Sequence, residues 1–199
     1  HEEIGMAIEE LYKDNQSEYY EALAEHYFLS ENYLKSADYS GLASMKAEIA
    51  VSLNDAIAHA KKRVTSLERL TWAEDVAKQI MDARVVLGLY MTKMNYFAQA
   101  KEAIDPIVDL AIRHNNKKKL CQIYTILGSY YWFVEDNYPE IFKALEEALK
   151  ISEEVKDIVS LVLASYWYAC ALGWNCEFER SANYFQKALD INLAVKNLW

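Results

Sequence analysis

The stretch ACALGWNCEFERSANYFQKAL, residues 169–189, contains the pattern that decides the fold. Ala169 is followed twelve residues later by Ser181, and seven residues after that by Ala188. Small residues on facing helices allow a close approach, because a larger side chain would push the two helices apart. The same spacing recurs in Ala24–Ser36–Ala43 and Gly88–Ala100–Ile107, and with one extra residue in Gly128–Ile141–Ala148. A helix pair repeated at a fixed spacing is typical of stacked helical arrays, which usually bind rather than catalyse.

The composition favours helices and restricts the partners. The 199 residues include only two Pro and five Gly, and 53% are hydrophobic, so turn formers are scarce and a core can form. The formal net charge of −9 disfavours nucleic acid and anionic membranes, because phosphate binding needs a basic surface. No apolar run approaches the roughly 20 residues of a membrane-spanning helix. We therefore predict a cytoplasmic protein that binds neither nucleic acid nor membrane.

Apolar periodicity predicts successive antiparallel helices joined by short turns, and no strand. We expect Asn54 or Asp55 to cap one helix and Thr71 to cap the next. The predicted helices cover residues 2–14, 17–30, 33–45, 55–69, 72–93, 96–113, 117–134, 138–155, 157–174 and 177–196, with 46–52 as a continuation or a separate short helix.

Several stretches resemble the tetratricopeptide repeat. Leu127-Gly128 followed by Tyr131 is similar to the first helix of that repeat, and ANYFQKAL, residues 182–189, is similar to its second. Leu87-Gly88 with Ala100 gives a further match. The resemblance implies an all-α right-handed superhelix, an α-solenoid of about four to five helix pairs forming a single domain over 1–199. Its approximate repeats are 17–46, 47–70, 71–114, 115–156 and 157–196.

The first third reads His1-x-x-Ile4-Gly5-x-x-Ile8-Glu9-x-x-Tyr12, then Tyr20-x-x-Leu23-Ala24-x-x-Tyr27, then Asn32-Tyr33-x-Lys35-Ser36-Ala37-x-Tyr39, and later Asn54-Asp55-Ala56-Ile57. This is similar to the region that follows the ATPase module in multidomain bacterial sensors. Many of those carry a class III adenylate or guanylate cyclase domain, and others are transcription activators or Ser/Thr kinases. The resemblance implies that this chain is a fragment of such a protein.

Catalytic and metal-binding motifs are absent from the sequence. There is no GxxxxGK[ST] or GxGxxG phosphate-binding loop and no HExxH, and the four His residues are scattered. We therefore predict no cofactor, no metal and no enzymatic activity for this chain. Cys121, Cys170 and Cys176 lack CxxC spacing and are expected to be reduced, buried thiols.

Aromatic residues are concentrated in two of the predicted helices. Consecutive helical residues point about 100° apart, so the members of an aromatic triplet cannot all face one core. Two interpretations remain open: large core residues between repeats, or a surface that binds a ligand or peptide. The residues concerned are Tyr130, Tyr131, Trp132, Tyr166, Trp167, Tyr168 and Trp174.

In tetratricopeptide proteins the binding groove is lined by first-helix residues that face away from the second helix. Chaperone-binding members place Lys, Asn and Arg there to hold a C-terminal carboxylate, and their absence here argues against such a clamp. The change from acidic to aromatic residues along the chain suggests a basic or apolar partner. By register, and with the aromatic Trp132, the candidate groove residues are Glu18, Glu21, Glu25, Asp82, Val85, Leu89, Gln122, Thr125, Ser129, Trp132, Tyr166 and Cys170.

These observations predict a non-catalytic protein–protein interaction or sensor module of a multidomain bacterial signalling ATPase, with or without a nucleotide cyclase domain. Its partner would be a protein, a peptide or another domain of the parent chain. The alternative is a superhelix that binds a small-molecule effector at the aromatic cluster and regulates an attached ATPase or transcription activator. An apolar face at the last helix, which ends near Trp199, would support a homodimer.

Overall fold

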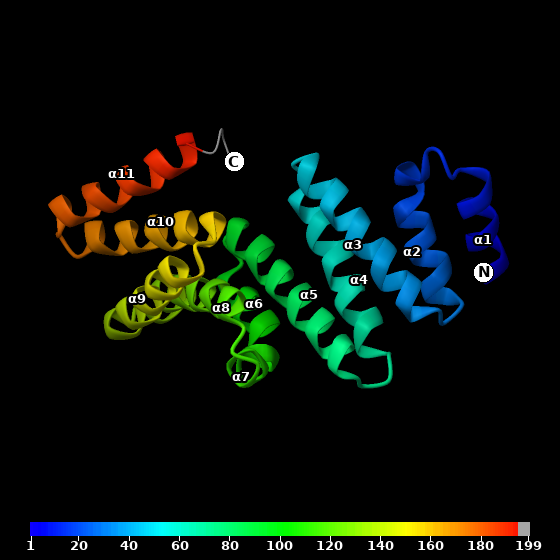
Figure 1. Ribbon diagram of the computed structural model, residues 1–199, viewed down its shortest axis with the longest axis horizontal. Helices are drawn as coiled ribbons and strands as arrows, with labels where there is room; N and C mark the ends of the chain where they lie inside the picture. The colour runs from blue at the N-terminus through cyan, green and yellow to red at the C-terminus, as the bar shows by residue number, and fades with distance from the viewer. Residues whose placement is uncertain (195–199) are drawn as a thin grey trace. The chain divides into compact units, whose positions relative to one another are not determined.

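The computed structural model describes residues 1–194, whose regular elements are all helices, without a strand among them (Figure 1). The predicted all-α class is therefore confirmed. The chain divides into two compact units, His1–Met94 (unit 1) and Asn95–Trp199 (unit 2), within the expected repeat 71–114. The single superhelical domain over 1–199 therefore stays a prediction. The end of the last predicted helix, with Trp199 and the homodimer face placed there, lies outside the described residues.

Unit 1 consists of helices that pack on their neighbours along the chain. Helix α3 packs on both α2 and α4, α5 packs on α4, and α1 packs on α2. Residues 46–49 continue α3, in agreement with one of the two expectations for this stretch. The elements are α1 (Glu2–Leu11), the 3₁₀ helix η1 (Gln16–Tyr19), α2 (Tyr20–Leu29), α3 (Tyr33–Ile49), α4 (Leu53–Glu68) and α5 (Glu74–Lys93).

Three helices of unit 1 begin at other residues than predicted. Helix α2 begins at Tyr20 and not at residue 17, because the 3₁₀ helix η1 occupies Gln16–Tyr19. Helix α4 begins at Leu53 after Ser52, so Asn54 and Asp55 lie in its first turn and do not cap it. Ser52 Oγ donates a hydrogen bond to Asp55 Oδ2 at 2.5 Å. The negative charge of Asp55 in the first turn stabilises α4, because it interacts favourably with the positive end of the helix dipole. Helix α5 begins only after Ala73, which places Thr71 outside the helix.

Unit 2 begins with an interrupted helix. The predicted helix over 96–113 is broken at Pro106, because proline lacks the backbone N–H that a continuous helix needs. The predicted helix 138–155 agrees with α9 at both ends. The elements are α6 (Phe97–Ile104), the 3₁₀ helix η2 (Asp105–Ile107), α7 (Val108–Arg113), α8 (Lys117–Tyr130), the π-helix η3 (Tyr131–Glu135), α9 (Tyr138–Val155), α10 (Ile158–Trp174) and α11 (Phe178–Ala194).

The small residues of the repeated pattern lie where paired helices touch. Ser36 Oγ donates a hydrogen bond to the Ala24 carbonyl at 3.0 Å, and Ser181 Oγ donates to the Ala169 carbonyl at 2.7 Å. Both bonds join residues twelve apart, one pair in each unit. The close approach predicted from this spacing is therefore confirmed for these two pairs. The Gly88–Ala100 pair spans the division between the units and stays a prediction.

The π-helix accounts for the one irregular copy of the pattern. Gly128 and Ile141 are thirteen residues apart where the other copies have twelve. A π-turn closes its hydrogen bond over five residues where an α-turn uses four, and so takes up one residue more. Residues 131–135 form this turn directly after α8, and the chain then reverses at Asp136, whose φ is 50°. The extra residue is thus absorbed before α9 begins.

Candidate functional site

Unit 2 presents a group of aromatic rings in mutual contact, which we call the aromatic surface. Phe133 stacks on Phe97 with ring centroids 4.3 Å apart, and Trp132 meets Trp167 edge to face at 6.1 Å. Trp132 meets Trp174 in the same way, also at 6.1 Å. The aromatic surface consists of Phe97, Trp132, Phe133, Tyr166, Trp167, Trp174 and Phe185.

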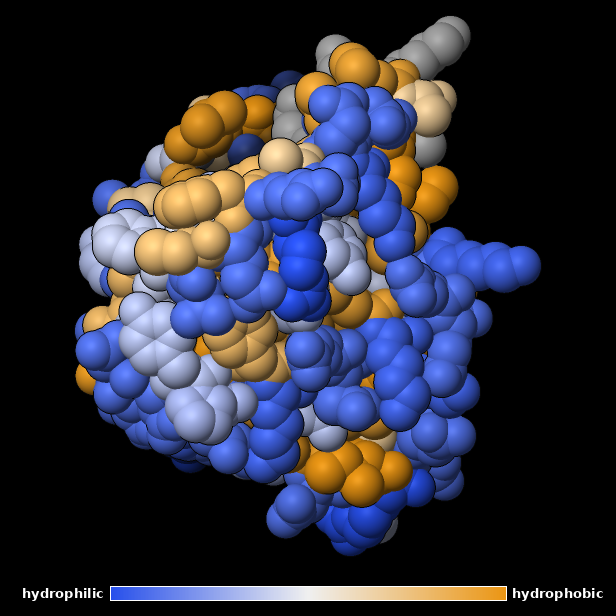
Figure 2. Space-filling model, turned by 90° about the vertical axis from the view of Figure 1, so that its left-hand side faces the viewer, coloured by the Kyte–Doolittle hydropathy of each residue, from blue (hydrophilic) through white to orange (hydrophobic). Residues whose placement is uncertain are grey.

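Several of these rings lie open to solvent. Trp174 is 71% exposed, Phe133 52% and Tyr166 48%. Figure 2 faces the end of unit 2 where α10 passes into α11, and apolar and weakly polar side chains lie there among hydrophilic ones. Exposed aromatic rings in a contiguous group mark a binding surface more often than single exposed apolar residues do.

Helix α10, which carries several of these rings, contains no charged residue. None of the residues Ile158–Trp174 is Asp, Glu, Lys or Arg. A helix that is apolar on all sides is normally buried on all sides, yet α10 leaves Tyr166 and Trp174 exposed. The exposed side of α10 therefore resembles an interface more than an ordinary solvated helix face.

The rings take their places from local structure. Trp132 and Phe133 belong to the π-helix, whose extra residue rotates them relative to a continuous α-helix. Such π-turns occur frequently at functional sites. Trp174 ends α10, and Phe185 lies on α11 within 5.9 Å of Tyr166, ring to ring.

An open pocket of about 320 Å³ adjoins the aromatic surface between α10 and α11. The pocket contains the small residues Ala169 and Gly173 because α10 and α11 pack closely here. A Cβ at Gly173 would lie only 3.2 Å from Ser181 Oγ. Burial raises the pKa of the Cys170 thiol, so this group stays protonated and is a poor nucleophile. The pocket is lined by Ala169, Cys170, Gly173, Trp174 and Phe185.

The candidate groove residues of unit 2 divide into two sets. Trp132, Tyr166 and Cys170 belong to the aromatic surface or its pocket. Gln122, Thr125 and Ser129 are buried on α8 and offer nothing to a partner.

Two of the buried groups are satisfied inside the fold. Thr125 Oγ1 donates to the Cys121 carbonyl at 2.9 Å, and Ser129 Oγ donates to the Ile126 carbonyl at 2.7 Å. For these residues the structure departs from the predicted groove, because the hydroxyls turn back onto their own helix.

Glu18 and Glu25, two of the four acidic candidates of unit 1, are neutralised within the fold. Glu18 pairs with Lys46, N to O, at 3.0 Å, and Glu25 pairs with Lys62. Glu21 is exposed on α2. Asp82 is half-buried on α5, which packs on α4, while Val85 on the same helix is fully buried and Leu89 half-buried. An open acidic groove built from Glu18 and Glu25 is therefore not what the structure shows.

The sequence did not indicate Phe97, Phe133 or Phe185 as members of the site. Two signals in the sequence point toward them: the one-residue excess between Gly128 and Ile141, and the absence of charge from 158 to 174. The first locates the π-turn that carries Phe133, and the second marks the helix on which the site is built.

The three cysteines differ in exposure. Cys121 is buried and its thiol donates to the Ala148 carbonyl at 3.2 Å. Cys170 is half-buried, and Cys176 is exposed in the turn before α11, where its φ is 62°. The prediction of buried thiols is therefore wrong for Cys176, because a reversal of the chain places it outside the helix pair.

Within residues 1–194, no group of three His, Cys, Asp or Glu is placed to hold a metal ion. No helix in that range has the length and apolar character to cross a bilayer. Comparison with protein-family models and with curated proteins found no match to this chain. Neither comparison assigns the chain to a family.

Proposed function

We propose that this chain is a non-catalytic interaction module, whose aromatic surface binds an apolar segment of a protein partner. In this proposal the two units belong to one right-handed tetratricopeptide-like superhelix. The module serves as the sensor arm of a multidomain bacterial signalling ATPase, with or without a cyclase domain. The partner is a second protein or another domain of the parent chain.

The observation that carries the proposal is the exposure of Phe133, Tyr166 and Trp174 beside a charge-free helix. A buried aromatic side chain covers about 150–250 Å², so about half of that area remains exposed on Phe133 and Tyr166, and more on Trp174. At about 25 cal/mol per Å², covering one such ring gives a favourable transfer free energy of about 2–3 kcal/mol, from which the entropy cost of association is subtracted. Rings of this kind act as anchors at interfaces because few rotatable bonds have to be ordered.

Selection from a phage-displayed peptide library on the full chain tests this surface. We expect the enriched peptides to carry apolar or aromatic anchors, and to bind Trp174→Ala and Phe133→Ala at least tenfold more weakly. Trp72→Ala is the matched control, because Trp72 is 76% exposed and belongs to unit 1, not to the aromatic surface. Equal losses at Trp72 and Trp174, or peptides insensitive to all three changes, would exclude the aromatic surface as the binding site.

The pocket supports a second candidate function, the binding of a small-molecule effector. Its volume of about 320 Å³ lies at the lower end of the range of ligand sites. A ligand that binds only the folded chain raises the melting temperature in proportion to RT ln(1 + [L]/Kd). A metabolite panel should therefore give a hit that is lost in Cys170→Phe, which fills the pocket. A panel without any hit leaves the peptide-binding proposal as the better one.

The wider context is tested by the coding sequence upstream of His1. An ATPase domain with a phosphate-binding loop there supports the signalling proposal. A start codon immediately before His1 would overturn it and leave a separate adaptor protein.

A further inference from the structure

Helix α1 turns its apolar side toward solvent. Ile4, Ile8 and Leu11 recur at helical spacing along one side of α1 and form what we call the α1 stripe. Leu11 is 74% exposed, Ile4 48%, and Ile8 is half-buried. The apolar side of a short amphipathic helix normally packs against the core. The α1 stripe has no such packing partner for Ile4 and Leu11, which are exposed.

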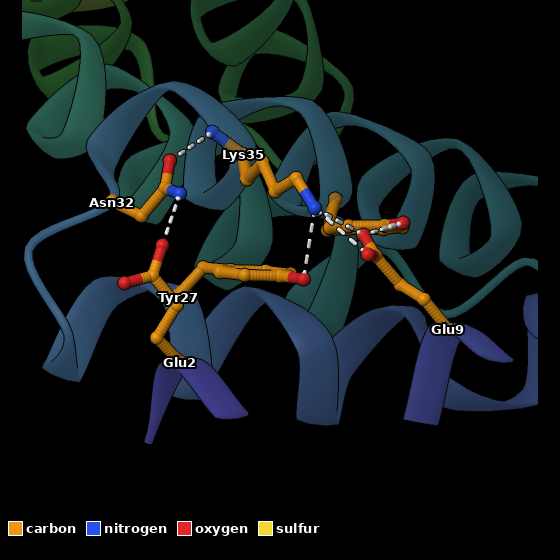
Figure 3. A network of polar contacts seen from close by, with 6 residues as sticks. Glu2, Glu9, Tyr27, Asn32 and Lys35 are labelled. Atoms are coloured by element: carbon orange, nitrogen blue, oxygen red, sulfur yellow. Dashed lines mark hydrogen bonds and ion pairs between the residues drawn. The ribbon is translucent and has the colours of Figure 1, made fainter. Parts of the chain in front are cut away.

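The opposite, polar side of α1 holds the helix on unit 1. Glu9 accepts hydrogen bonds from Lys35 Nζ at 2.7 Å and from the Tyr39 hydroxyl at 2.6 Å (Figure 3). Glu2 accepts one from Asn32 Nδ2 at 3.0 Å. Gly5 lies against the Tyr27 ring, where a Cβ would come within 2.9 Å of Cζ. These contacts fix the rotation of α1, and with it the outward direction of the stripe.

Two carboxylates without a cation lie on the same helix as the α1 stripe. Glu3 and Glu10 share one side of α1, seven residues apart, and point about 100° around the helix from Ile4 and Leu11. Both are exposed, and neither side chain forms an ion pair or hydrogen bond within the described part of the chain. Residues 1–31 contain nine Asp or Glu and a single Lys.

The distribution of ion pairs shows which acids remain available. Lysines of α3 and α4 neutralise Glu9, Glu18 and Glu25. Among residues 1–194, no such lysine reaches Glu3 or Glu10. On α1 itself, the carboxylates left without a partner are therefore those of Glu3 and Glu10, on the helix that carries the stripe.

We propose that the α1 stripe is a docking site for a basic amphipathic helix of a partner protein. Its apolar residues would cover Ile4, Ile8 and Leu11, and its Lys or Arg side chains would pair with Glu3 and Glu10. An anionic lipid surface is disfavoured by the same carboxylates, which would repel its headgroups. The site is distinct from the aromatic surface and does not depend on it.

The stripe is small, so we expect weak, salt-dependent binding. Three aliphatic side chains and two carboxylates make an interface at the lower end of the size range for transient complexes. The exposed carboxylates are screened by salt, so the affinity should fall as ionic strength rises. We expect dissociation constants in the micromolar range at physiological salt, on the order of 10 μM.

Titration of the full chain with a fluorescent 18-residue Leu/Lys amphipathic peptide tests the proposal, with anisotropy as the readout. The same peptide with Glu in place of Lys should bind at least tenfold more weakly. Ile4→Ser with Leu11→Ser should weaken the Leu/Lys peptide at least tenfold. Ile49→Ser, at an 81% exposed residue of α3, is the control for the loss of an exposed apolar side chain.

A second pair of variants separates local from general charge. Glu3→Gln with Glu10→Gln removes two negative charges from α1, and Glu21→Gln with Glu31→Gln removes two exposed charges elsewhere in unit 1. We expect a three- to tenfold loss of affinity for the first pair and less than twofold for the second. Circular dichroism and urea unfolding confirm that each variant is folded. Equal losses for the two pairs, or equal binding of the Glu peptide, would overturn the proposal, because binding would then follow net charge or apolar character alone.

Discussion

Replacement of Gly128 by Ala tests the close packing of α8 on α9. In an exposed helix this change stabilises by about 1 kcal/mol, because Ala loses less backbone entropy than Gly on folding. At Gly128 the new Cβ would lie 2.6 Å from both Cδ2 and Cγ of Leu145. Ordinary contact begins near 3.4 Å, so one of the two groups has to shift by most of an ångström.

Leu145 has no room for that shift. It is fully buried in the core of unit 2, among Cys121, Ile141 and Leu172. Overpacking of a well-packed core costs about 1–3 kcal/mol, and a clash with Cγ, which can move only by a change of χ1 or a shift of the helix, belongs at the upper end. Subtracting the gain in helix propensity leaves a net loss of about 2 kcal/mol in the free energy of unfolding.

Urea unfolding of the full chain at 25 °C, followed by circular dichroism, measures this loss. Gly41→Ala is the matched control, because its Cβ would meet only the flexible guanidinium of Arg63 at 3.2 Å. We expect Gly41→Ala to lie within about 1 kcal/mol of the parent chain. In a double-mutant cycle, Leu145→Ala should cost less in the Gly128→Ala background, by about 1–2 kcal/mol. A Gly128→Ala chain as stable as the Gly41→Ala chain would mean that α8 and α9 have room for a Cβ at residue 128.

Three further predictions concern individual side chains. Burial raises the pKa of Glu9, but hydrogen bonds from Lys35, Tyr39 and Tyr27 outweigh it, so the folded-state pKa is lowered. The resulting stability is present above the unfolded pKa of about 4.3 and is lost as pH falls through the lower folded pKa. Glu9→Gln should therefore cost about 1 kcal/mol at pH 7 in urea unfolding, and the cost should shrink as the pH is lowered below 4, with Glu10→Gln unchanged throughout. Burial raises the pKa of the Cys121 thiol to about 11, so a thiol reagent at pH 8 should label Cys176 in the folded chain and Cys121 only after unfolding; equal rates would contradict the described burial. Ser181→Ala removes the hydrogen bond to the Ala169 carbonyl and should lower the free energy of unfolding by about 1 kcal/mol, whereas a neutral result would mean that small size alone matters at this position.

The helices themselves could be predicted because their signals are local. Apolar periodicity and capping act within a few residues, and Asn32, Asn116, Asn137 and Asp157 cap α3, α8, α9 and α10 in the structure. The prediction of one helix over 96–113 was wrong, because Pro106 interrupts the helix. Proline is a local signal that the apolar periodicity does not include.

The candidate site could be predicted only in part. Trp132 and Tyr166 were indicated because consecutive aromatic residues cannot all face one core. Thr125 and Ser129 were assigned to an open groove by register alone, and register does not say how deeply neighbouring helices bury a position. Phe133 is exposed and lies in the π-turn. The extra residue of that turn changes the direction of the following side chains, so a helical wheel of a regular α-helix does not predict their direction.

The helical class, most helix positions and the close pairs Ala24–Ser36 and Ala169–Ser181 follow from residue spacing along one or two neighbouring helices, so they could be predicted without a structure. The free carboxylates and the side of α1 that faces solvent could not be predicted in this way, because they depend on contacts between distant helices. The pairs Glu9–Lys35, Glu18–Lys46 and Glu25–Lys62 join residues on different helices, so they exist only after those helices have packed. Packing paired Glu18 and Glu25, two of the acids expected to form a groove, and it left Glu3 and Glu10 unpaired on the helix that exposes Ile4 and Leu11.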